Sequence, residues 1–482
     1  MRRGVFVASL ALSGLVAACS AGTPKAVPQR LVLITVDTLR ADHMSSFGYP
    51  ITTTPFLDRL AAEGTLFTRA YAQSATTKPS HSSIFTSLYP VQHGVRNNGL
   101  ILDEEFETLA EMLAAAGYAT AAFVSTDVPL GGNVGQGFEV WDQHRVDRDL
   151  EGGRSLYRAA GDTVDRALAW VDEAVERGQE RFLLWVHVYD PHKPLQPPAE
   201  VLEEVEDMIA EHGEQAYRDL LVSRGIPADN RLGTARTAGT AGTAGTARTA
   251  VAAYDAEILY ADRQLARLFA HLDATGLNDE TLWIATSDHG QGLGAHDWFG
   301  HSKQIYNAQL WVPLVFWQAG VAGGIRVGER VVQHVDVLPT VAEIFGLTPN
   351  QIMPMQGQSL TRYLDGERSR DAGWFAFAER SYYGNASERR QQRGNYEPGE
   401  RYSLQDTEYK YLLHLEGDDE FYDLRNDPYE LVDMIASPEL AGRRDQMRDV
   451  LASMLQNMPS EHEAQAVSPE DIERLRDLGY IQ

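Results

Sequence analysis

LVLITV, residues 31–36, is a continuous and largely β-branched run that leads directly into Asp37. A strand that is buried on both faces of a sheet has this composition. Further strands of the same kind are predicted over 120–124, 182–188 and 281–286, and the last two also end on polar segments. Buried strands that recur at long intervals along a chain indicate an α/β sheet.

Helical patterns separate these strands. Thr54 and Pro55 suit the N-cap and first turn of a helix, and Gly64 is placed to end it. Further helices are predicted over 107–116, 157–177 and 258–272, the last with apolar residues at steps of three and four. Alternating strands and helices predict the α/β class, with a doubly wound sheet and helices on both of its faces.

The length of 482 residues leaves room for more than one domain. The alternation weakens beyond about residue 366, so we predict a main domain over 30–366 and a smaller C-terminal α+β subdomain over 367–482. Residues 233–250 are six triplets, GTA or RTA, without a large apolar side chain to bury. We expect these triplets to form a surface insertion with no catalytic role.

The N-terminus has the pattern of an export signal. Two arginines precede an apolar run, 5–16, that is too short to span a ~30 Å hydrocarbon core. The run ends in small residues directly before Cys19, which resembles the bacterial lipobox. We therefore expect a lipoprotein signal peptide (1–18) and a tether (19–29), with lipidation at Cys19. The mature protein would be exported and lipid-anchored, periplasmic or at the cell surface, with the bacterial outer membrane favoured.

The composition excludes some kinds of binding partner and site. The chain has 68 acidic residues against 42 Lys and Arg, a formal net charge of −26. Nucleic acid is therefore not an expected partner, because its binding needs basic surface. Cys19 is the only cysteine, which excludes an intramolecular disulfide and a multi-cysteine zinc site.

Acids and histidines follow the predicted strands. Asp37, Asp190 and the pair Asp288-His289 lie where ligands bind in open α/β sheets, beyond the carboxyl ends of strands. Thr77 lies at the start of a predicted helix, whose positive end suits an oxyanion. A threonine hydroxyl needs a base or a metal to become a good nucleophile, and the neighbouring acids and histidine offer ligands for a divalent ion. The alternative is that Thr77 only caps its helix.

A series of short motifs connects these residues. It consists of VDTLRADH (36–43), TKPSH (77–81), HGVRNNG (93–99), HVYDPH (187–192), YDAEI (254–258), TSDHG (286–290), GHSK (300–303), VDVLPT (335–340) and YDL (422–424). In this order the motifs resemble the sulfatase family of the alkaline phosphatase superfamily. The resemblance covers nearly all of residues 31–482 apart from the triplets, and it implies an alkaline phosphatase-like fold.

The resemblance also implies roles for individual residues. Asp37, Thr77, Asp288 and His289 match the metal-binding positions, and Thr77 also matches the nucleophile. The positions that hold or protonate the charged group of the substrate are matched by Asn98, His187, His192, His301 and Lys303, with His192 and His301 catalytic. The metal would be a divalent ion (Ca, Mg, Mn or Zn). The number of ions, one or two, stays open, because Asp190, His192 and His301 could hold a second one.

The chain departs from the family pattern at three positions. Thr77 replaces the cysteine or serine that sulfatases convert to formylglycine, His81 replaces an arginine, and Thr38 replaces an acid. A formylglycine hydrate expels sulfate by collapsing to the aldehyde, whereas a threonine ester requires water to attack the central atom. In this respect Thr77 resembles the nucleophile of the superfamily's phosphatases and phosphodiesterases.

These observations favour a metal-dependent hydrolase that cleaves a sulfate or phosphate ester through a Thr77 alkoxide. Phosphodiesterase, phosphonate hydrolase or phosphoethanolamine-type transferase chemistry is one alternative. A non-catalytic, lipid-anchored binding protein is the other, and the retained Asp37, Asp288 and His289 argue against it.

Overall fold

The structure is a computed structural model that describes most of the chain after residue 26. The described residues are 27–126, 134–143, 157–227, 250–321, 323–350, 353–368, 374–381, 399–458 and 465–468. The predicted signal peptide, Cys19, most of the tether and all but the last residue of the triplets lie outside them. Within the described ranges, no helix has the length and apolar character that a membrane span requires.

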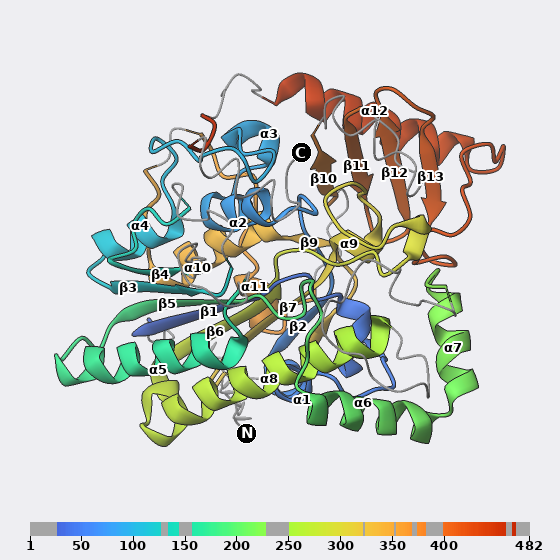
Figure 1. Cartoon of the computed structure of the whole chain (residues 1–482). Helices are drawn as coiled ribbons and strands as arrows, with labels where there is room; N and C mark the ends of the chain where they lie inside the picture. The colour runs from blue at the N-terminus through green and yellow to red at the C-terminus, as the bar shows by residue number, and fades with distance from the viewer. Residues whose placement is uncertain are drawn as a thin grey trace, which may run out of the picture.

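A mixed β-sheet forms the centre of the molecule (Figure 1). β1 (Arg30–Val36) lies between β5 (Phe182–Val188) and β6 (Thr281–Ser287) and runs parallel to both. The other strands are β2 (Thr65–Tyr71), β3 (Ala119–Val124), β4 (Val140–Gln143), β7 (Trp311–Gln318), β8 (Ile325–Val327) and β9 (Val332–Gln333). Their order is β4-β3-β5-β1-β6-β7-β2-β8, with β9 also paired to β2.

One strand of this sheet runs against the rest. β7 pairs antiparallel with both β6 and β2, so the sheet is mixed and not wholly parallel. The α/β class and the strands over 120–124, 182–188 and 281–286 are confirmed. The direction of β7 follows from pairings with strands that are distant in the sequence, which local patterns do not encode.

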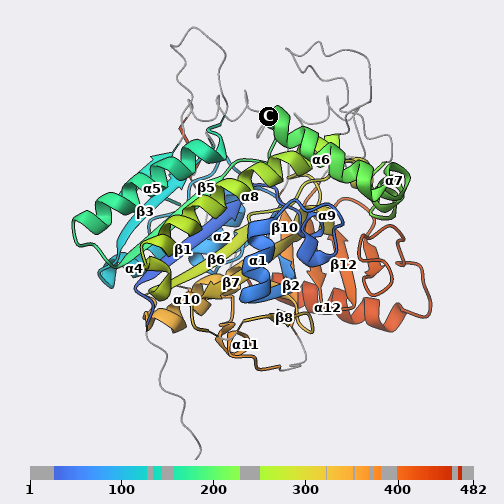
Figure 2. The same cartoon turned by 90° about the horizontal axis from the view of Figure 1, so that it is seen from below.

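Helices cover both faces of the sheet (Figures 1 and 2). One face carries α1 (Pro55–Glu63), α5 (Ala160–Glu176), α6 (Ala199–His212) and α8 (Ala250–Ala274). The other face carries α2 (Thr77–Thr86), α4 (Leu109–Ala115) and α10 (Val337–Phe345). β1 supplies both cores, because alternate residues of a strand point to opposite faces. Val32 and Ile34 join the first core, and Leu31 and Leu33 join the second.

A separate antiparallel sheet follows in the C-terminal part, drawn in orange and red in Figure 1. It consists of β10 (Ala376–Arg380), β11 (Arg401–Gln405), β12 (Tyr409–His414) and β13 (Glu420–Asp423), in that order. α12 (Ala441–Asn457) packs on it through Met447 and Leu451, which are buried in its core. The smaller C-terminal α+β subdomain is therefore confirmed, while its boundary at residue 366 stays a prediction.

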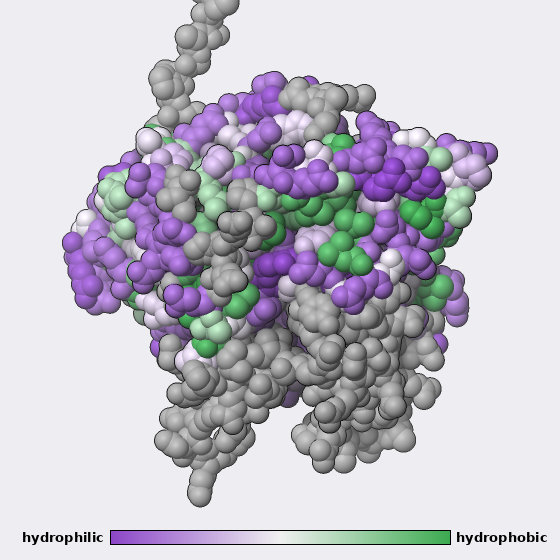
Figure 3. All heavy atoms as spheres, turned by 90° about the horizontal axis from the view of Figure 1, so that it is seen from above, coloured by the Kyte–Doolittle hydropathy of each residue, from purple (hydrophilic) through white to green (hydrophobic). Residues whose placement is uncertain are grey.

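Short helices complete the described chain. They are α3 (Pro90–His93), α7 (Glu214–Ser223), α9 (Asn307–Leu310) and α11 (Thr361–Leu364). The face shown in Figure 3 is largely hydrophilic where it is described, with hydrophobic residues in separate patches. This surface agrees with a formal net charge of −26.

Candidate active site

Two buried carboxylates meet beyond the ends of β1 and β6. Asp37 directly follows β1, and its backbone N–H donates to the Val188 carbonyl at the end of β5 (2.9 Å). Asp288 directly follows β6, and its Oδ1 accepts from the backbone N–H groups of Thr38 (3.2 Å) and His289 (2.9 Å). Thr38 has a φ of 58°, an uncommon conformation that turns the chain after Asp37. The parallel strands thus bring together acids that are 251 positions apart.

The two carboxylates and His289 form a group that suits a metal ion. Their ligand atoms lie within 4.8 Å of one another, and they are the only such group of three or more residues in the described part of the chain. Both oxygens of Asp37 and Oδ2 of Asp288 are buried without a hydrogen-bond partner. Buried carboxylate oxygens without partners are costly, and a divalent cation would satisfy them.

The pKa values of these three residues also indicate a cation site. Burial and the neighbouring Asp288 carboxylate raise the pKa of Asp37 well above its ordinary range. Burial raises the pKa of Asp288 to about 6 and lowers the pKa of His289 to about 4. The site therefore disfavours two negative charges when no cation is bound, and it keeps the imidazole neutral, as a metal ligand must be.

Thr77 faces this group from the first turn of α2. Its Oγ1 is 3.4 Å from His289 Nε2, and His289 Nδ1 lies 3.0 Å from the Gly290 carbonyl, to which it donates. That bond fixes the tautomer and directs the Nε2 lone pair toward Thr77 and the carboxylates. The N-cap of α2 is Thr76, so the interpretation of Thr77 as a mere helix cap is not needed.

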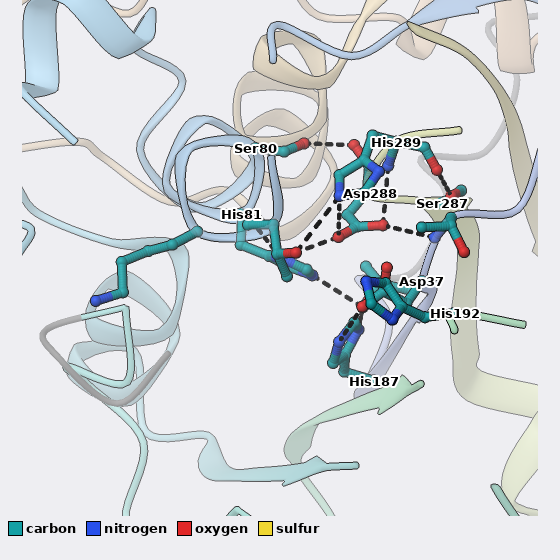
Figure 4. A network of polar contacts seen from close by, with 12 residues as sticks. Asp37, Ser80, His81, His187, His192, Ser287, Asp288 and His289 are labelled. Carbon is teal, nitrogen blue, oxygen red and sulfur yellow. Dashed lines mark hydrogen bonds and ion pairs between the residues drawn. The ribbon is translucent and has the colours of Figure 1, made fainter. Parts of the chain in front are cut away.

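Threonine and histidine side chains connect α2 to the central strands. His81 Nδ1 donates to the Thr77 carbonyl (2.8 Å), and its Nε2 lies 3.1 Å from Thr35 Oγ1. The same hydroxyl contacts His187 Nδ1 at 3.0 Å. His187 Nε2 is 3.7 Å from Asp37 Oδ2 and has no hydrogen-bond partner. Figure 4 shows His187 beside Asp37, with His81 and Asp288 close by.

His192 and His301 face each other across the site. Their Nε2 atoms are 2.9 Å apart, and the ring of His301 stacks on that of His289 with centroids 4.5 Å apart. His192 Nδ1 donates to the Lys193 carbonyl (2.7 Å), and His301 Nδ1 lies 3.1 Å from the Ala75 carbonyl, to which it donates. Both Nε2 atoms of the neutral rings are then acceptors, so their contact is a hydrogen bond only when one of the two rings carries a second proton. The Ser302 hydroxyl lies 2.8 Å from His301 Nδ1. Burial lowers the pKa of both histidines well below the ordinary range.

The remaining predicted residues lie in three different settings. Asn98 Oδ1 accepts from the Lys78 backbone N–H in the first turn of α2 (2.9 Å), and its Nδ2 is buried without a partner. The Lys303 ammonium lies over the Trp298 ring, 5.1 Å from its centroid. Asp190 Oδ2 accepts from the Ala160 N–H at the start of α5 (2.9 Å).

Asp190 is therefore engaged in structure. Its carboxyl is hydrogen-bonded to that of Glu257 on α8, and burial raises the pKa of both groups, that of Glu257 to about 10. His192 and His301 come together as expected, but Asp190 does not join them in a ligand group within the described chain. The Asp190 carboxyl instead bonds to the N-terminus of α5 and to the Glu257 carboxyl.

Sequence reasoning missed the residues that support the His301 loop. Lys410 on β12 is fully buried, forms an ion pair with Glu430 (2.6 Å) and donates to the Ile305 carbonyl (2.7 Å). The Arg380 guanidinium donates to the Lys303 carbonyl (2.7 Å). The C-terminal sheet thus holds the segment that follows His301. A lysine within an otherwise apolar strand pattern was the one available signal.

Comparison with known proteins identifies the family. The family model "Sulfatase" matches residues 29–347, which include every predicted catalytic, substrate-binding and metal-binding residue. The chain belongs to the sulfatase family. A second model, "N-sulphoglucosamine sulphohydrolase, C-terminal", matches residues 294–457 and so covers the small sheet. This sulfatase-family chain is an ester hydrolase with a mixed α/β fold.

Relatives and solved structures agree with this assignment. The "N-acetylglucosamine-6-O-sulfatase" of Bacteroides thetaiotaomicron is 24% identical, with 92% of this chain and 89% of the relative covered. The "Multifunctional alkaline phosphatase superfamily protein PehA" of Trinickia caryophylli is 28% identical, with 86% and 92% covered. The crystal structure of the phosphonate monoester hydrolase of Agrobacterium radiobacter superposes with a TM-score of 0.69 at 23% identity, covering 92% of this chain and 100% of that one. That structural likeness supports the fold.

Proposed function

We propose that this sulfatase-family protein is a metal-dependent hydrolase in which the Thr77 hydroxyl attacks a sulfate or phosphate ester. One observation carries the proposal: Thr77 Oγ1 lies 3.4 Å from His289 Nε2, beside buried carboxylate oxygens that lack partners. A threonine that served only structure would not need this setting. Buried acids without partners are also costly unless they bind a ligand.

The proposed ligands are Asp37, Asp288, His289 and the Thr77 oxygen. When bound, a divalent ion supplies positive charge that lowers the pKa of the Thr77 hydroxyl and offsets charge on the transferred group. The donor set combines hard oxygens with one imidazole. This combination favours Mn²⁺ or Zn²⁺ over Ca²⁺ and Mg²⁺, which prefer oxygen ligands alone.

The other residues divide the reaction between them. Thr77 attacks the sulfur or phosphorus atom in line with the leaving oxygen. Asn98 Nδ2, which is buried and without a partner, donates to an equatorial oxygen of the ester. The proton held between the Nε2 atoms of His301 and His192, which are 2.9 Å apart, passes to the leaving oxygen, and the lowered pKa of both rings makes that imidazolium a strong acid. Water then attacks the central atom and releases Thr77.

The nature of Thr77 bears on the ester that is cleaved. A threonine ester offers no route through an aldehyde, so water must reach the central atom directly. We infer that phosphate and phosphonate esters are at least as good substrates as sulfate esters. The names of two relatives, a sugar 6-O-sulfatase and a multifunctional superfamily protein, support testing both classes.

Location is a further part of the proposal. We propose that Cys19 carries a lipid and anchors the exported protein, with residues 19–29 as its tether. β1 begins at Arg30, and Pro28 and Gln29 already bond to the folded body, which therefore starts at the end of this segment. Replacing Cys19 by alanine should release the protein from the membrane fraction without lowering its activity. Retention of the variant in that fraction would contradict the anchor.

The catalytic proposal is tested by variants and a substrate panel. The purified protein is assayed with p-nitrophenyl sulfate, phosphate, phosphodiester and phosphonate esters, each with Mn²⁺, Zn²⁺, Ca²⁺ or Mg²⁺. Thr77→Ala should reduce turnover by about 10⁴-fold or more while Mn²⁺ still binds, because loss of a nucleophile typically has an effect of this size. Thr77→Ser should retain measurable activity.

Full activity in Thr77→Ala would show that Thr77 is not the nucleophile. Hydrolysis of the sulfate ester alone by the wild type would contradict the inference from threonine chemistry. Failure to hydrolyse any ester with any of the four ions would favour the binding-protein alternative.

A further inference from the structure

A cavity of about 550 Å³ lies where the edge of the main sheet meets the C-terminal sheet. This volume is within the range of small-molecule sites, which often lie between domains. None of its lining residues belongs to the group around Thr77. They are Ser46, Phe47, Gly48, Thr68, Arg69, Tyr71, Asn307, Trp311, Arg326, Gly328, Asp406, Thr407, Leu424 and Pro428.

Two guanidinium groups line this cavity without a carboxylate partner. Arg326 Nη2 donates to the Ser46 carbonyl (2.7 Å), and Arg69 Nη1 donates to the Thr407 carbonyl. In the part of the chain that is described, neither group lies within 4.0 Å of a carboxylate oxygen. Each guanidinium has five N–H donors, so one bond to a carbonyl orients it and leaves donors for a ligand.

The single acid in the lining does not neutralise these arginines. Asp406 forms an ion pair with Arg443 and accepts from the backbone N–H groups of Glu408 and Tyr409, both at 2.8 Å. The cavity is therefore locally positive within a chain of formal net charge −26. Most of this surface repels anions, so a locally positive cavity is where one can be held.

Aromatic and hydroxyl groups complete the lining. The half-buried Trp311 and Phe47 rings pack edge to face with centroids 5.7 Å apart, and Trp311 Nε1 donates to the Thr68 carbonyl (3.0 Å). A fixed indole face suits the apolar face of a ring. The Ser46 hydroxyl donates to Asp58 Oδ1 and keeps a lone pair that can accept, and Asn307 Nδ2, which donates to the Pro428 carbonyl (3.2 Å), keeps its second N–H for a ligand. Inorganic phosphate or sulfate alone would use the arginines but not the aromatic rings.

We propose that this cavity binds an anionic sugar, a saccharide ring that carries a sulfate or carboxylate group. Arg69 and Arg326 bind the anionic group, and Trp311 packs against the ring. The site is separate from Thr77, and the proposal holds whether or not Thr77 is a nucleophile.

Calorimetry on the full-length protein tests the proposal. The probes are N-acetylglucosamine 6-sulfate, N-acetylglucosamine and inorganic sulfate. Arg326→Gln should weaken binding of the sulfated sugar by about 10-fold, the loss expected for one charge-assisted contact, and Arg69→Gln should do the same. Arg218→Gln, which removes an exposed arginine on α7 that pairs with Glu214, is the matched control and should leave the affinity unchanged.

Two further measurements separate this cavity from the proposed active site. Asn98→Ala should leave the Arg326-dependent binding intact, and Arg326→Gln should hydrolyse p-nitrophenyl esters within about 2-fold of the wild-type rate. Binding that is lost in Asn98→Ala and unaffected by either arginine variant would overturn the proposal. Equal affinity for inorganic sulfate and the sulfated sugar would also overturn it, because the aromatic rings would then contribute nothing.

Discussion

Two buried clusters of aspartate and histidine differ in how their oxygens are satisfied. In the cluster around Asp37 and Asp288, three of the four carboxylate oxygens have no hydrogen-bond partner. In the cluster around Asp255, Oδ1 pairs with His43 Nδ1 (2.7 Å), and Oδ2 accepts from the hydroxyl groups of Tyr49 (2.5 Å) and Tyr217 (3.0 Å). The same residue types thus form a candidate ligand site in one place and a structural support in the other.

The two clusters are connected. The residue before Asp255 is Tyr254, whose hydroxyl donates to the Thr38 carbonyl (2.7 Å) and accepts from the Arg40 N–H (3.0 Å). The satisfied cluster therefore lies beneath the turn that presents Asp37. The comparison teaches that a buried acid is a candidate ligand when its partners are missing, and not merely because it lies near a histidine.

The largest expected effect comes from the cluster around Asp37 and Asp288, whose carboxylate oxygens lack partners. Asp37→Asn should lower kcat/KM by about 10³-fold or more and weaken Mn²⁺ binding by more than about 100-fold, the upper range for losing an outer-shell contact. In chelator, the same variant should be more stable than the wild type, because asparagine has no carboxyl group that must take up a proton or bear a charge beside Asp288 on folding. Thermal melts with and without Mn²⁺ measure this, and a less stable metal-free variant would contradict the reading of Asp37 as an unsatisfied ligand.

A change in the cluster around Asp255 should instead lower the stability of the protein and leave its Mn²⁺ affinity nearly unchanged. Asp255→Asn leaves His43 and two tyrosine hydroxyls without their charged acceptor and should cost about 3 kcal/mol of unfolding free energy. Mn²⁺ affinity should stay within about 3-fold of the wild type. Urea denaturation and calorimetry give the two numbers. If Asp255→Asn abolished metal binding while the protein stayed folded, the distinction between the clusters would fail.

The third contrast concerns the carboxyl pair of Asp190 and Glu257, which is buried but has partners. The folded protein keeps a proton on Glu257 up to a pKa of about 10, whereas the unfolded chain loses it near the ordinary value of 4.5. Since the folded state then binds more protons, this pair makes stability fall as pH rises through that window, by up to about 1.4 kcal/mol per pH unit.

Glu257→Gln tests this pH dependence. Glutamine cannot lose a proton and can still accept from the Gln196 backbone N–H, as Glu257 Oε1 does (2.5 Å). Stability measured from pH 6 to pH 9 should therefore fall less steeply in the variant than in the wild type. Glu204→Gln on exposed α6 serves as the control and should leave the slope unchanged. Parallel curves for Glu257→Gln and the wild type would show that Asp190 and Glu257 share no proton.

Much of the fold could be predicted because its signals are local. β5 has the predicted bounds of 182–188, α1 begins at Pro55 as Thr54 and Pro55 indicate, and Gly64 follows its last residue. Asp37 and Asp288 could be grouped in advance because parallel strands end at one edge of a sheet. The antiparallel direction of β7 could not, since it depends on pairing with β6 and β2.

Local patterns were enough to single out the residues that can do chemistry here. Asp37, Thr77, Asp288 and His289 each follow a strand pattern or begin a helix. Which acids lack partners, and so are free to bind a ligand, depends on long-range packing. Asp190 and Asp255 satisfy their oxygens with partners 30 to 212 positions away, such as Ala160 and His43, and such distances leave no trace in a local pattern. Hydrogen-bond satisfaction is a property of the packed chain, and it separates the ligands from the supports.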